Sequence, residues 1–437
     1  MKNKKDYIVF VFIFLLCAEA VCLFSEVRVF IIRFFENFII HRKVASFDEK
    51  MAYLLHTTFF TMEITGIIAL MYIWIKKHYV EISNNFIDFL RVIATACVFI
   101  LHTAIFTNQH GDVFAVPYTH PLRTPAWGGV WIFFLLSGYL AARGFALKKY
   151  EYSLKGITRY YKRKLTNIYI PTLFFIFICC IFVFPTFLKD NPAVIVRLLS
   201  CTYNGGPGVN GIGATWFIST LMQLYILCPL FCKMIEMIRE RKIVLIIVYA
   251  ITALLGLSYR MIAYAYSFNW HTAIYAPSYA NLDLFICGML TYYIADVYRK
   301  KICISGSVEK ISLYLLLLFI LINALTYHQL YMYAIVYPTV YVLLVSLNLF
   351  VFHERNMPPV STTGKYITFL SSISFGFYLF HSLILHNLYA FLPVFKNIYL
   401  LHAELLICGA VMSGIFAIGF NKIFNRKPCV QVDNTKI

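Results

Sequence analysis

Long apolar segments recur along the whole chain, and they constrain its fold more than any other feature. Most are about 18 residues or longer, which is the length that a helix needs to cross roughly 30 Å of hydrocarbon. With 61% hydrophobic and only 13% charged residues, the chain has too little polar surface to cover itself in water. The sequence therefore predicts an all-α, polytopic membrane bundle of about twelve transmembrane helices.

The predicted spans leave no segment long enough for a separate soluble domain. The first span follows a basic N-terminal segment, and no convincing small-residue cleavage site comes after it, so it is interpreted as a retained helix rather than a signal peptide. The twelve spans cover residues 7–24, 53–75, 86–107, 127–147, 167–187, 214–232, 243–265, 275–297, 311–327, 334–353, 366–391 and 398–421.

The basic residues concentrate in alternate connections between the spans. With the N-terminus inside, 26 of the 38 Lys and Arg residues fall on the cytoplasmic side and nine on the opposite side. This bias follows the positive-inside rule and predicts that both termini face the cytoplasm, with the chain in the inner (cytoplasmic) membrane of the cell. Because the cations do not gather in one basic domain, the net charge of +18 does not indicate nucleic-acid binding.

Two ionisable residues of the third span share one helix face. Arg91 and His102 have ten residues between them, so His102 lies within about 20° of the azimuth of Arg91 and ~16 Å further from the cytoplasm. One interpretation is that Arg91 snorkels to the interface while His102 hydrogen-bonds a neighbouring helix. The other is that the imidazole serves as a base for a hydroxyl in acyl transfer.

Few other polar groups lie inside the predicted spans. Glu63 and Asp283 are in the second and eighth spans, and His381 is in the eleventh. Charged groups at such depth usually face a partner, a cavity or a reaction. Either carboxylate is therefore a candidate for orienting a base histidine, or for neutralising Arg260 or Arg143.

Two connections have compositions that suit a site. Residues from Lys148 to Lys164 set seven cations against the single acid Glu151. This charge either attracts the phosphates of an acyl-CoA or serves only as a topology signal. The connection from Lys189 to Gly213 is glycine-rich, and it either turns tightly over the mouth of a site or is an ordinary flexible connector.

Five short patterns occur in a fixed order along the spans. They are Arg91 to His102, Trp131 to Leu140, Trp216 to Leu230, Phe285 to Gly288 and Ser374 to His381. Together they resemble the acyltransferase-3 family, a group of mostly ten-span membrane O-acyltransferases that act on cell-surface glycans. The resemblance covers roughly residues 84–421.

The resemblance implies a division of the chain and an activity. Residues 1–83 would form two additional N-terminal helices, residues 84–421 a ten-helix acyltransferase core, and residues 422–437 a cytoplasmic tail. The expected enzyme moves an acyl group, with acetyl the expected one, from cytoplasmic acyl-CoA to a hydroxyl of a cell-surface or lipid-linked glycan. Its partners would be acyl-CoA, the glycan and membrane lipids, and no nucleic acid, metal or bound cofactor is expected.

The resemblance also implies roles for single residues. Arg91 is expected to contact or position the donor, and His102 to act as general base or acyl relay. The residues expected at substrate-binding positions are Lys162, Arg163, Lys164, Ser137, Trp216 and His381.

The chain departs from the family pattern at two places. The family usually has two Arg three positions apart shortly before an Ile-Tyr and a Pro, where this chain has Lys164 and Asn167 before residues 168–171. Acidic residues common after the Trp motif are absent from residues 219–223, which leaves the substrate open. The alternative functions are a multi-span transporter and an acyltransferase-like assembly factor without catalysis.

Overall fold

The computed structural model describes residues 70–108, 127–183, 186, 190–204, 212–266, 271–299, 302–325, 332–353, 361–391 and 398–424. The chain divides into two compact units, Met1–Tyr79 and Val80–Ile437. In the first unit, the described residues 70–79 are helical. The predicted span 7–24, most of the span 53–75 and the candidate residue Glu63 lie outside the described residues.

The second unit is built from helices, and no β-strand occurs among its described residues. The π-helical turns Leu165–Tyr169 and Cys179–Val183 continue α6 and α7, so these form one long helix. The helices are α4 Phe86–Asn108, α5 Gly128–Ala146, α6 Leu154–Lys164, α7 Ile170–Ile178, α9 Pro192–Leu199, α10 Trp216–Met237, α11 Lys242–Tyr266, α12 Leu282–Tyr298, α13 Gly306–Leu325, α14 Tyr337–Val351, α15 Thr362–Phe391 and α16 Ile398–Ile423.

Nine helices in the described part are long and apolar enough to cross a membrane. They correspond to nine of the ten spans predicted from residue 86 onward, and the prediction of an all-α polytopic membrane bundle is confirmed. The remaining span, 275–297, corresponds to α12, which has only 17 residues and is buried along most of its length. Residues 271–281 before α12 form short π-helical and 3₁₀ turns instead of extending the helix.

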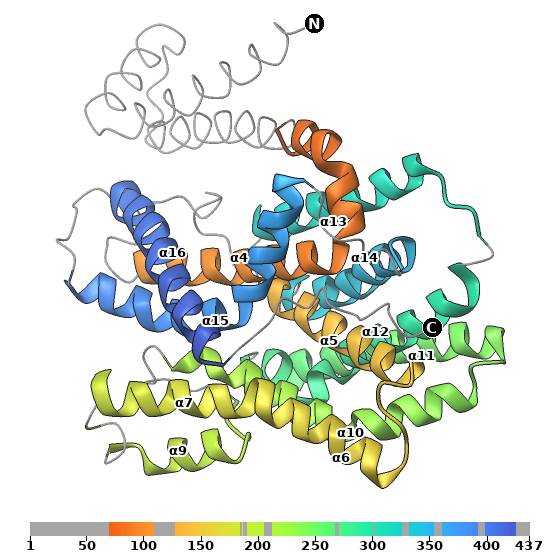
Figure 1. Ribbon diagram of the computed structural model, residues 1–437, viewed down its shortest axis with the longest axis horizontal. Helices are drawn as coiled ribbons and strands as arrows, with labels where there is room; N and C mark the ends of the chain where they lie inside the picture. Colours follow the sequence, from red (N-terminus) through yellow and green to blue (C-terminus); the bar gives the residue numbers. More distant parts are fainter. Residues whose placement is uncertain are drawn as a thin grey trace, which may run out of the picture. The chain divides into compact units, whose positions relative to one another are not determined.

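The most extensive contact between two described helices joins α5 and α12, which lie side by side (Figure 1). Glycines allow this approach, because a Cβ atom on Gly138 would lie 2.0 Å from the carbonyl oxygen of Phe285, and one on Gly288 would lie 2.1 Å from that of Leu135. Small residues at helix crossings let backbones pack closely in membranes, where burial of apolar surface drives association weakly. α5 also packs on α4, α10 and α14.

The outer helix α11 turns most of its apolar side chains outward and packs on α12 with a narrow face. In that face, Arg260 is 1% exposed, and one of its Nη atoms lies 2.7 Å from both carboxylate oxygens of Asp283. Gly256 makes room for the pair, because a Cβ there would lie 2.0 Å from Asp283. Of the partners considered for Asp283, the structure therefore selects Arg260, and the pair removes the cost of an isolated buried charge.

Candidate functional site

Two histidines from distant parts of the chain meet between α4 and α15. Nδ1 of His102 lies 3.2 Å from Nε2 of His381, and the ring centroids are 4.7 Å apart at an interplanar angle of 78°. His381 is 1% exposed, whereas His102 is half-buried. The sequence placed both residues within spans, but it did not indicate that they are partners.

Hydrogen bonds to the backbone define the tautomer of both rings. Nδ1 of His102 lies 2.8 Å from the carbonyl oxygen of Val98, and Nδ1 of His381 lies 2.6 Å from that of Tyr378. A carbonyl oxygen only accepts, so each Nδ1 carries the hydrogen and each neutral ring has its lone pair at Nε2. The lone pair of His381 then faces the Nδ1–H of His102. No hydrogen bond within the described part of the chain engages Nε2 of His102, so this atom has a lone pair that can accept a proton.

Arg91 lies on the same face of α4, about eleven residues or ~16 Å from His102. Its guanidinium is 3.4 Å from a carboxylate oxygen of Asp88, and the same oxygen accepts a hydrogen bond of 2.7 Å from Ser371 on α15. The hydroxyl of Thr95 donates to the backbone oxygen of Arg91. The structure therefore adds Asp88 and Ser371 to the candidate site. Asp88 could have been found from the sequence, because it lies one helical turn before Arg91.

Aromatic side chains connect the histidine pair to α5 and α10. The ring of Tyr378 lies 5.5 Å from that of His381, 5.3 Å from that of Phe217 on α10 and 6.2 Å from that of Phe133 on α5. Its hydroxyl donates to the carbonyl oxygen of Ala214 at 2.7 Å, which holds the ring in place. α4, α5, α10 and α15 thus meet around the pair.

Ser137 and Trp216, two of the predicted substrate contacts, occupy different surroundings. Ser137 is half-buried one helical turn after Phe133, so it shares the face of α5 that is turned toward α10 and α15. Trp216 is 8% exposed and packs against Tyr275 and His271. Trp216 has no ring contact with either histidine of the pair among the described residues, and Phe217 and Tyr378 lie between them.

The cations of α6 divide between two faces of the helix. Nζ of Lys164 lies 3.6 Å from the ring centroid of Tyr225 on α10, so this cation points into the bundle. Lys162 and Arg163 are exposed, and Lys162 lies about 200° around the helix from Lys164. The structure does not bring these three predicted donor contacts to one point. In the loop before α6, burial raises the pKa of Tyr150, an effect that nearby Arg163 partly offsets.

A proline in α10 explains why α6 docks there. Pro229 has no N–H, so the carbonyl group of Tyr225 loses its usual helical donor. The hydroxyl of Tyr160 on α6 donates to that oxygen at 3.4 Å, and Tyr161 donates to the neighbouring oxygen of Ile226 at 2.7 Å. The inner face of α6 is thereby tied to α10, and its cationic face stays exposed.

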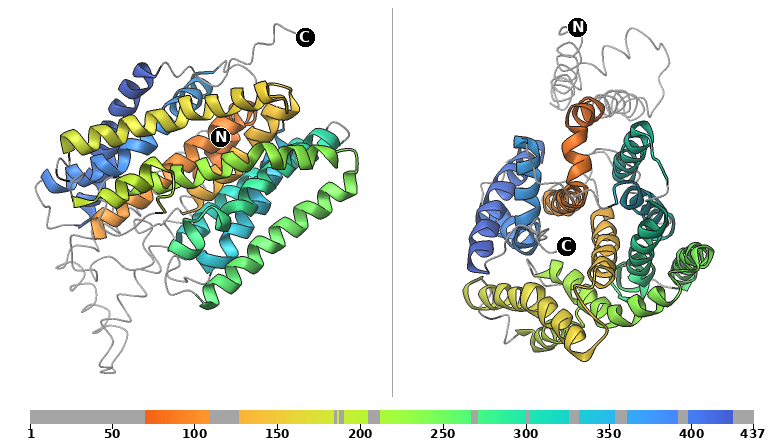
Figure 2. Two further views of the ribbon diagram at one scale, coloured as in Figure 1. Left: turned by 90° about the horizontal axis from the view of Figure 1, so that it is seen from below. Right: turned by 45° about the vertical axis from the view of Figure 1, so that its right-hand side comes forward.

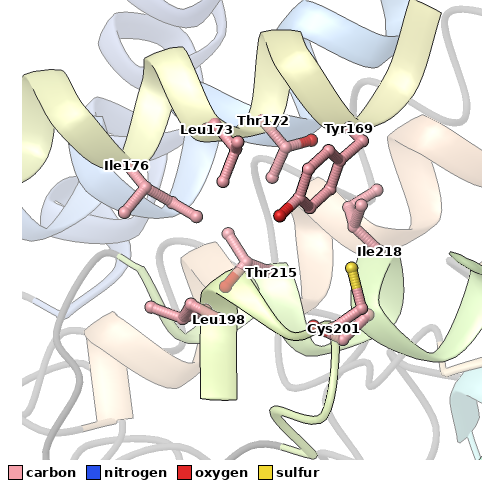
Figure 3. Close-up of a pocket in the computed structure, with 9 residues that line it drawn as sticks. Tyr169, Thr172, Leu173, Ile176, Leu198, Cys201, Thr215 and Ile218 are labelled. Atoms are coloured by element: carbon pink, nitrogen blue, oxygen red, sulfur yellow. The ribbon is translucent and has the colours of Figure 1, made fainter. Parts of the chain in front are cut away.

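A small crevice with a cavity volume of about 10 Å³ lies between α7 and the start of α10 (Figure 3). Two hydrogen bonds hold the turn after α9 against it, from Tyr169 to the oxygen of Leu199 at 2.5 Å and from Gln223 to that of Cys201 at 2.6 Å. The described part of the predicted connector 189–213 thus contains a helix and a tethered turn, whereas residues 205–211, with most of its glycines, lie outside the described residues. None of the predicted site residues lines the crevice.

α16 lies beside α15 (Figures 1 and 2) and also packs on α4, so it contacts both helices that carry the histidine pair. Phe99 of α4 packs with Leu385, Leu401 and Leu405 in a buried apolar cluster. This cluster lies next to the pair in sequence on both α4 and α15, so the surroundings of the histidines are apolar on that side. Among the described residues, no group of His, Cys, Asp and Glu has the arrangement of a metal site.

Comparison with known proteins gives a family assignment. Searches of the curated proteins and of the solved structures gave no significant match. The model of the acyltransferase-3 family, an acyltransferase domain, matches residues 84–421, which include Arg91, both histidines of the pair and the helices that surround them. The chain therefore belongs to the acyltransferase-3 family and is a membrane acyltransferase.

Proposed function

We propose that this protein is an O-acyltransferase that moves an acyl group, with acetyl the expected one, from cytoplasmic acyl-CoA to a hydroxyl of a cell-surface or lipid-linked glycan. The observation that supports it best is the histidine pair, because the ring of His102 is held through Nδ1 while its Nε2 has no hydrogen bond from the residues that the structure describes. A hydroxyl is a weak nucleophile until a base takes its proton. A membrane acyltransferase that carries such a base is suited to a hydroxyl acceptor.

In the proposed reaction, Nε2 of His102 accepts the proton of the glycan hydroxyl while the hydroxyl oxygen attacks the thioester carbonyl carbon of the donor. The tetrahedral intermediate collapses, the C–S bond breaks, and the sulfur of coenzyme A takes the proton from His102. The products are an O-acylated glycan and free coenzyme A. His102 ends the cycle neutral, as it began.

Arg91 contributes a cation on the same face of α4 as His102. Asp88 orients the guanidinium from one helical turn away, and Ser371 holds Asp88. The proposed role of Arg91 is to bind an anionic oxygen of the donor and so position its thioester, since guanidinium groups bind anionic oxygens well. Lys162 and Arg163 on the exposed face of α6 would attract the donor from the cytoplasm, while the ammonium group of Lys164 lies over the ring of Tyr225.

The test is transfer of label in membrane vesicles that carry the full chain. Vesicles are incubated with radiolabelled acetyl-CoA, and label is followed into the polysaccharide fraction. The expected result is labelled polysaccharide with the unaltered protein and almost none with His102→Ala. His386→Ala, which removes a half-buried histidine from α15 outside the pair, is the matched control and should keep the activity.

The outcome also separates the alternatives. If the protein were a transporter or an assembly factor without catalysis, labelling of the polysaccharide would not exceed that in vesicles without the protein. Equal labelling by the unaltered protein and His102→Ala would contradict the proposed role of His102.

A further inference from the structure

We infer that His381 is a positioning residue for His102 rather than a contact of the substrate. Its Nε2 is a second acceptor for the Nδ1–H of His102, beside the carbonyl oxygen of Val98 that selects the tautomer, and it orients the ring so that Nε2 of His102 is left for the glycan hydroxyl. The inference rests on the proposed function in one respect, the use of His102 as the base. It goes beyond that function because it assigns the group that orients His102 and stabilises its imidazolium.

Burial and hydrogen bonding leave His381 no atom for a substrate. The side chain is 1% exposed, its Nδ1 donates to the oxygen of Tyr378 at 2.6 Å, and its Nε2 lies 3.2 Å from His102. His102, by contrast, is half-buried and has both backbone and side-chain acceptors for its single Nδ1–H, at 2.8 Å and 3.2 Å. The ring of His381 is therefore enclosed with both nitrogens hydrogen-bonded, whereas the ring of His102 has Nε2 available to react.

This arrangement gives a neutral imidazole the place that a carboxylate holds in a Ser-His-Asp triad. There the carboxylate selects the tautomer of the base and stabilises the imidazolium that forms. Here the carbonyl oxygen of Val98 selects the tautomer, and His381 orients the ring and stabilises the imidazolium without an anion in the span, where an unpaired charge is costly. When His102 takes a proton at Nε2, its bond to His381 becomes charge-assisted and stronger.

Nearby charged groups are engaged elsewhere. On α4, Asp88 pairs with Arg91, and Arg91 lies ~16 Å from His102 along the helix. On α15, the titratable side chain in ring contact with the pair is Tyr378, whose hydroxyl donates to a backbone oxygen. The carboxylate of Asp88 lies about 21 Å from His102 along α4 and is engaged by Arg91 and Ser371, and the hydroxyl of Tyr378 is neutral, so neither replaces His381 as acceptor.

Among the residues that the structure describes, the other neighbouring helices place no competing side-chain acceptor against the pair. α5 and α10 turn Phe133 and Phe217 toward Tyr378. α16 contacts this region through apolar residues around Gly409. Of its ionisable residues, His402 and Glu404 lie further toward the N-terminal end, Lys422 lies at the C-terminal end, and the thiol of Cys408 directly precedes Gly409.

Two variants separate the hydrogen bond from the shape of the side chain. His381→Phe keeps a ring but removes the acceptor, and His381→Gln keeps an amide oxygen near the position of Nε2. We expect His381→Phe to lower kcat at least about ten-fold, with the KM for acetyl-CoA within about two-fold, since the base loses its orientation. His381→Gln should recover most of kcat, which a purely structural role would not predict.

A second readout does not depend on transfer. Diethyl pyrocarbonate reacts with neutral imidazole, so its rate of reaction with His102, followed by peptide mass spectrometry from pH 5 to 8, reports the midpoint of His102 protonation. Removing an acceptor from the imidazolium disfavours the charged form, so the midpoint in His381→Phe should move down by about half to one pH unit. In His381→Gln it should stay near the wild-type value.

The outcomes distinguish this inference from the proposed function. An unlabelled glycan with the unaltered protein would refute the proposed acyl transfer, while the midpoint shift still tests the pair. Equal midpoints and equal kcat in all three proteins would overturn the positioning role. So would a wild-type His102 that does not react, because its open Nε2 is the premise. If His381→Phe does not accumulate in membranes, a kcat for His381→Gln as low as that of His102→Ala would overturn it.

Discussion

The contact between α5 and α12 allows a test of how the bundle holds its site together. Gly138→Ala would place a Cβ 2.0 Å from the carbonyl oxygen of Phe285, so the two helices must separate by about 1 Å to reach ordinary contact distance. Overpacking of this kind typically costs about 1–3 kcal/mol, of which the higher helix propensity of Ala returns about 0.5–1 kcal/mol. We expect a net loss of about 1–2 kcal/mol.

The loss is measured as the apparent Tm of the protein in detergent, by the fraction that remains monodisperse after heating. For a chain of this size, at about 2.1 cal/mol/K of unfolding entropy per residue, the expected decrease is roughly 1–3 °C. Gly414→Ala on α16 is the matched control, because a Cβ there meets no atom within 4 Å, and it should leave the Tm unchanged or slightly higher. Gly288→Ala perturbs the same crossing, so its effect should not add fully to that of Gly138→Ala.

Activity should fall as well, since α5 carries Phe133, which contacts Tyr378 beside His381, and Ser137 on the same face. A displacement of about 1 Å near a reaction centre can lower the rate by about 10²-fold. An unchanged Tm and unchanged acyl transfer in Gly138→Ala would show that α5 and α12 do not cross as closely as described. A similar loss in Gly414→Ala would show that the effect is not specific to the crossing.

Three further predictions concern the donor, the base and the orientation. His102→Ala should lower transfer by about 10²- to 10⁴-fold at every acetyl-CoA concentration. Arg91→Ala should recover part of its activity with excess acetyl-CoA. If excess acetyl-CoA restored both variants equally, the division of roles between base and donor contact would be contradicted. Replacing both Lys162 and Arg163 by Gln should raise the half-saturating acetyl-CoA concentration more than Lys164→Gln does, with protease protection as a check of insertion. Reporters fused to the two termini should both indicate the cytoplasm, and a signal from opposite sides would refute the predicted orientation.

Patterns along single segments were sufficient for the helices and for part of the site. Apolar length predicted the spans because the bilayer thickness sets how many residues a helix needs to cross it. The eleven-residue spacing placed Arg91 and His102 on one face because the helical repeat is constant. These features are local, so they survive whatever packing the helix adopts, and the motif order was enough to indicate the family.

Tertiary structure alone decided which helices meet and which polar groups are partners. His102 and His381 are 279 residues apart, and the sequence equally allowed Asp283 to serve a histidine, Arg143 or Arg260. The consecutive residues Lys162, Arg163 and Lys164 suggest one binding site in the sequence, but the docking of α6 on α10 turns Lys164 toward Tyr225 and leaves the other two exposed. Helix partners in a membrane are selected by close packing and a few hydrogen bonds rather than by burial of apolar surface, and the apolar periodicity of a single chain does not encode that choice.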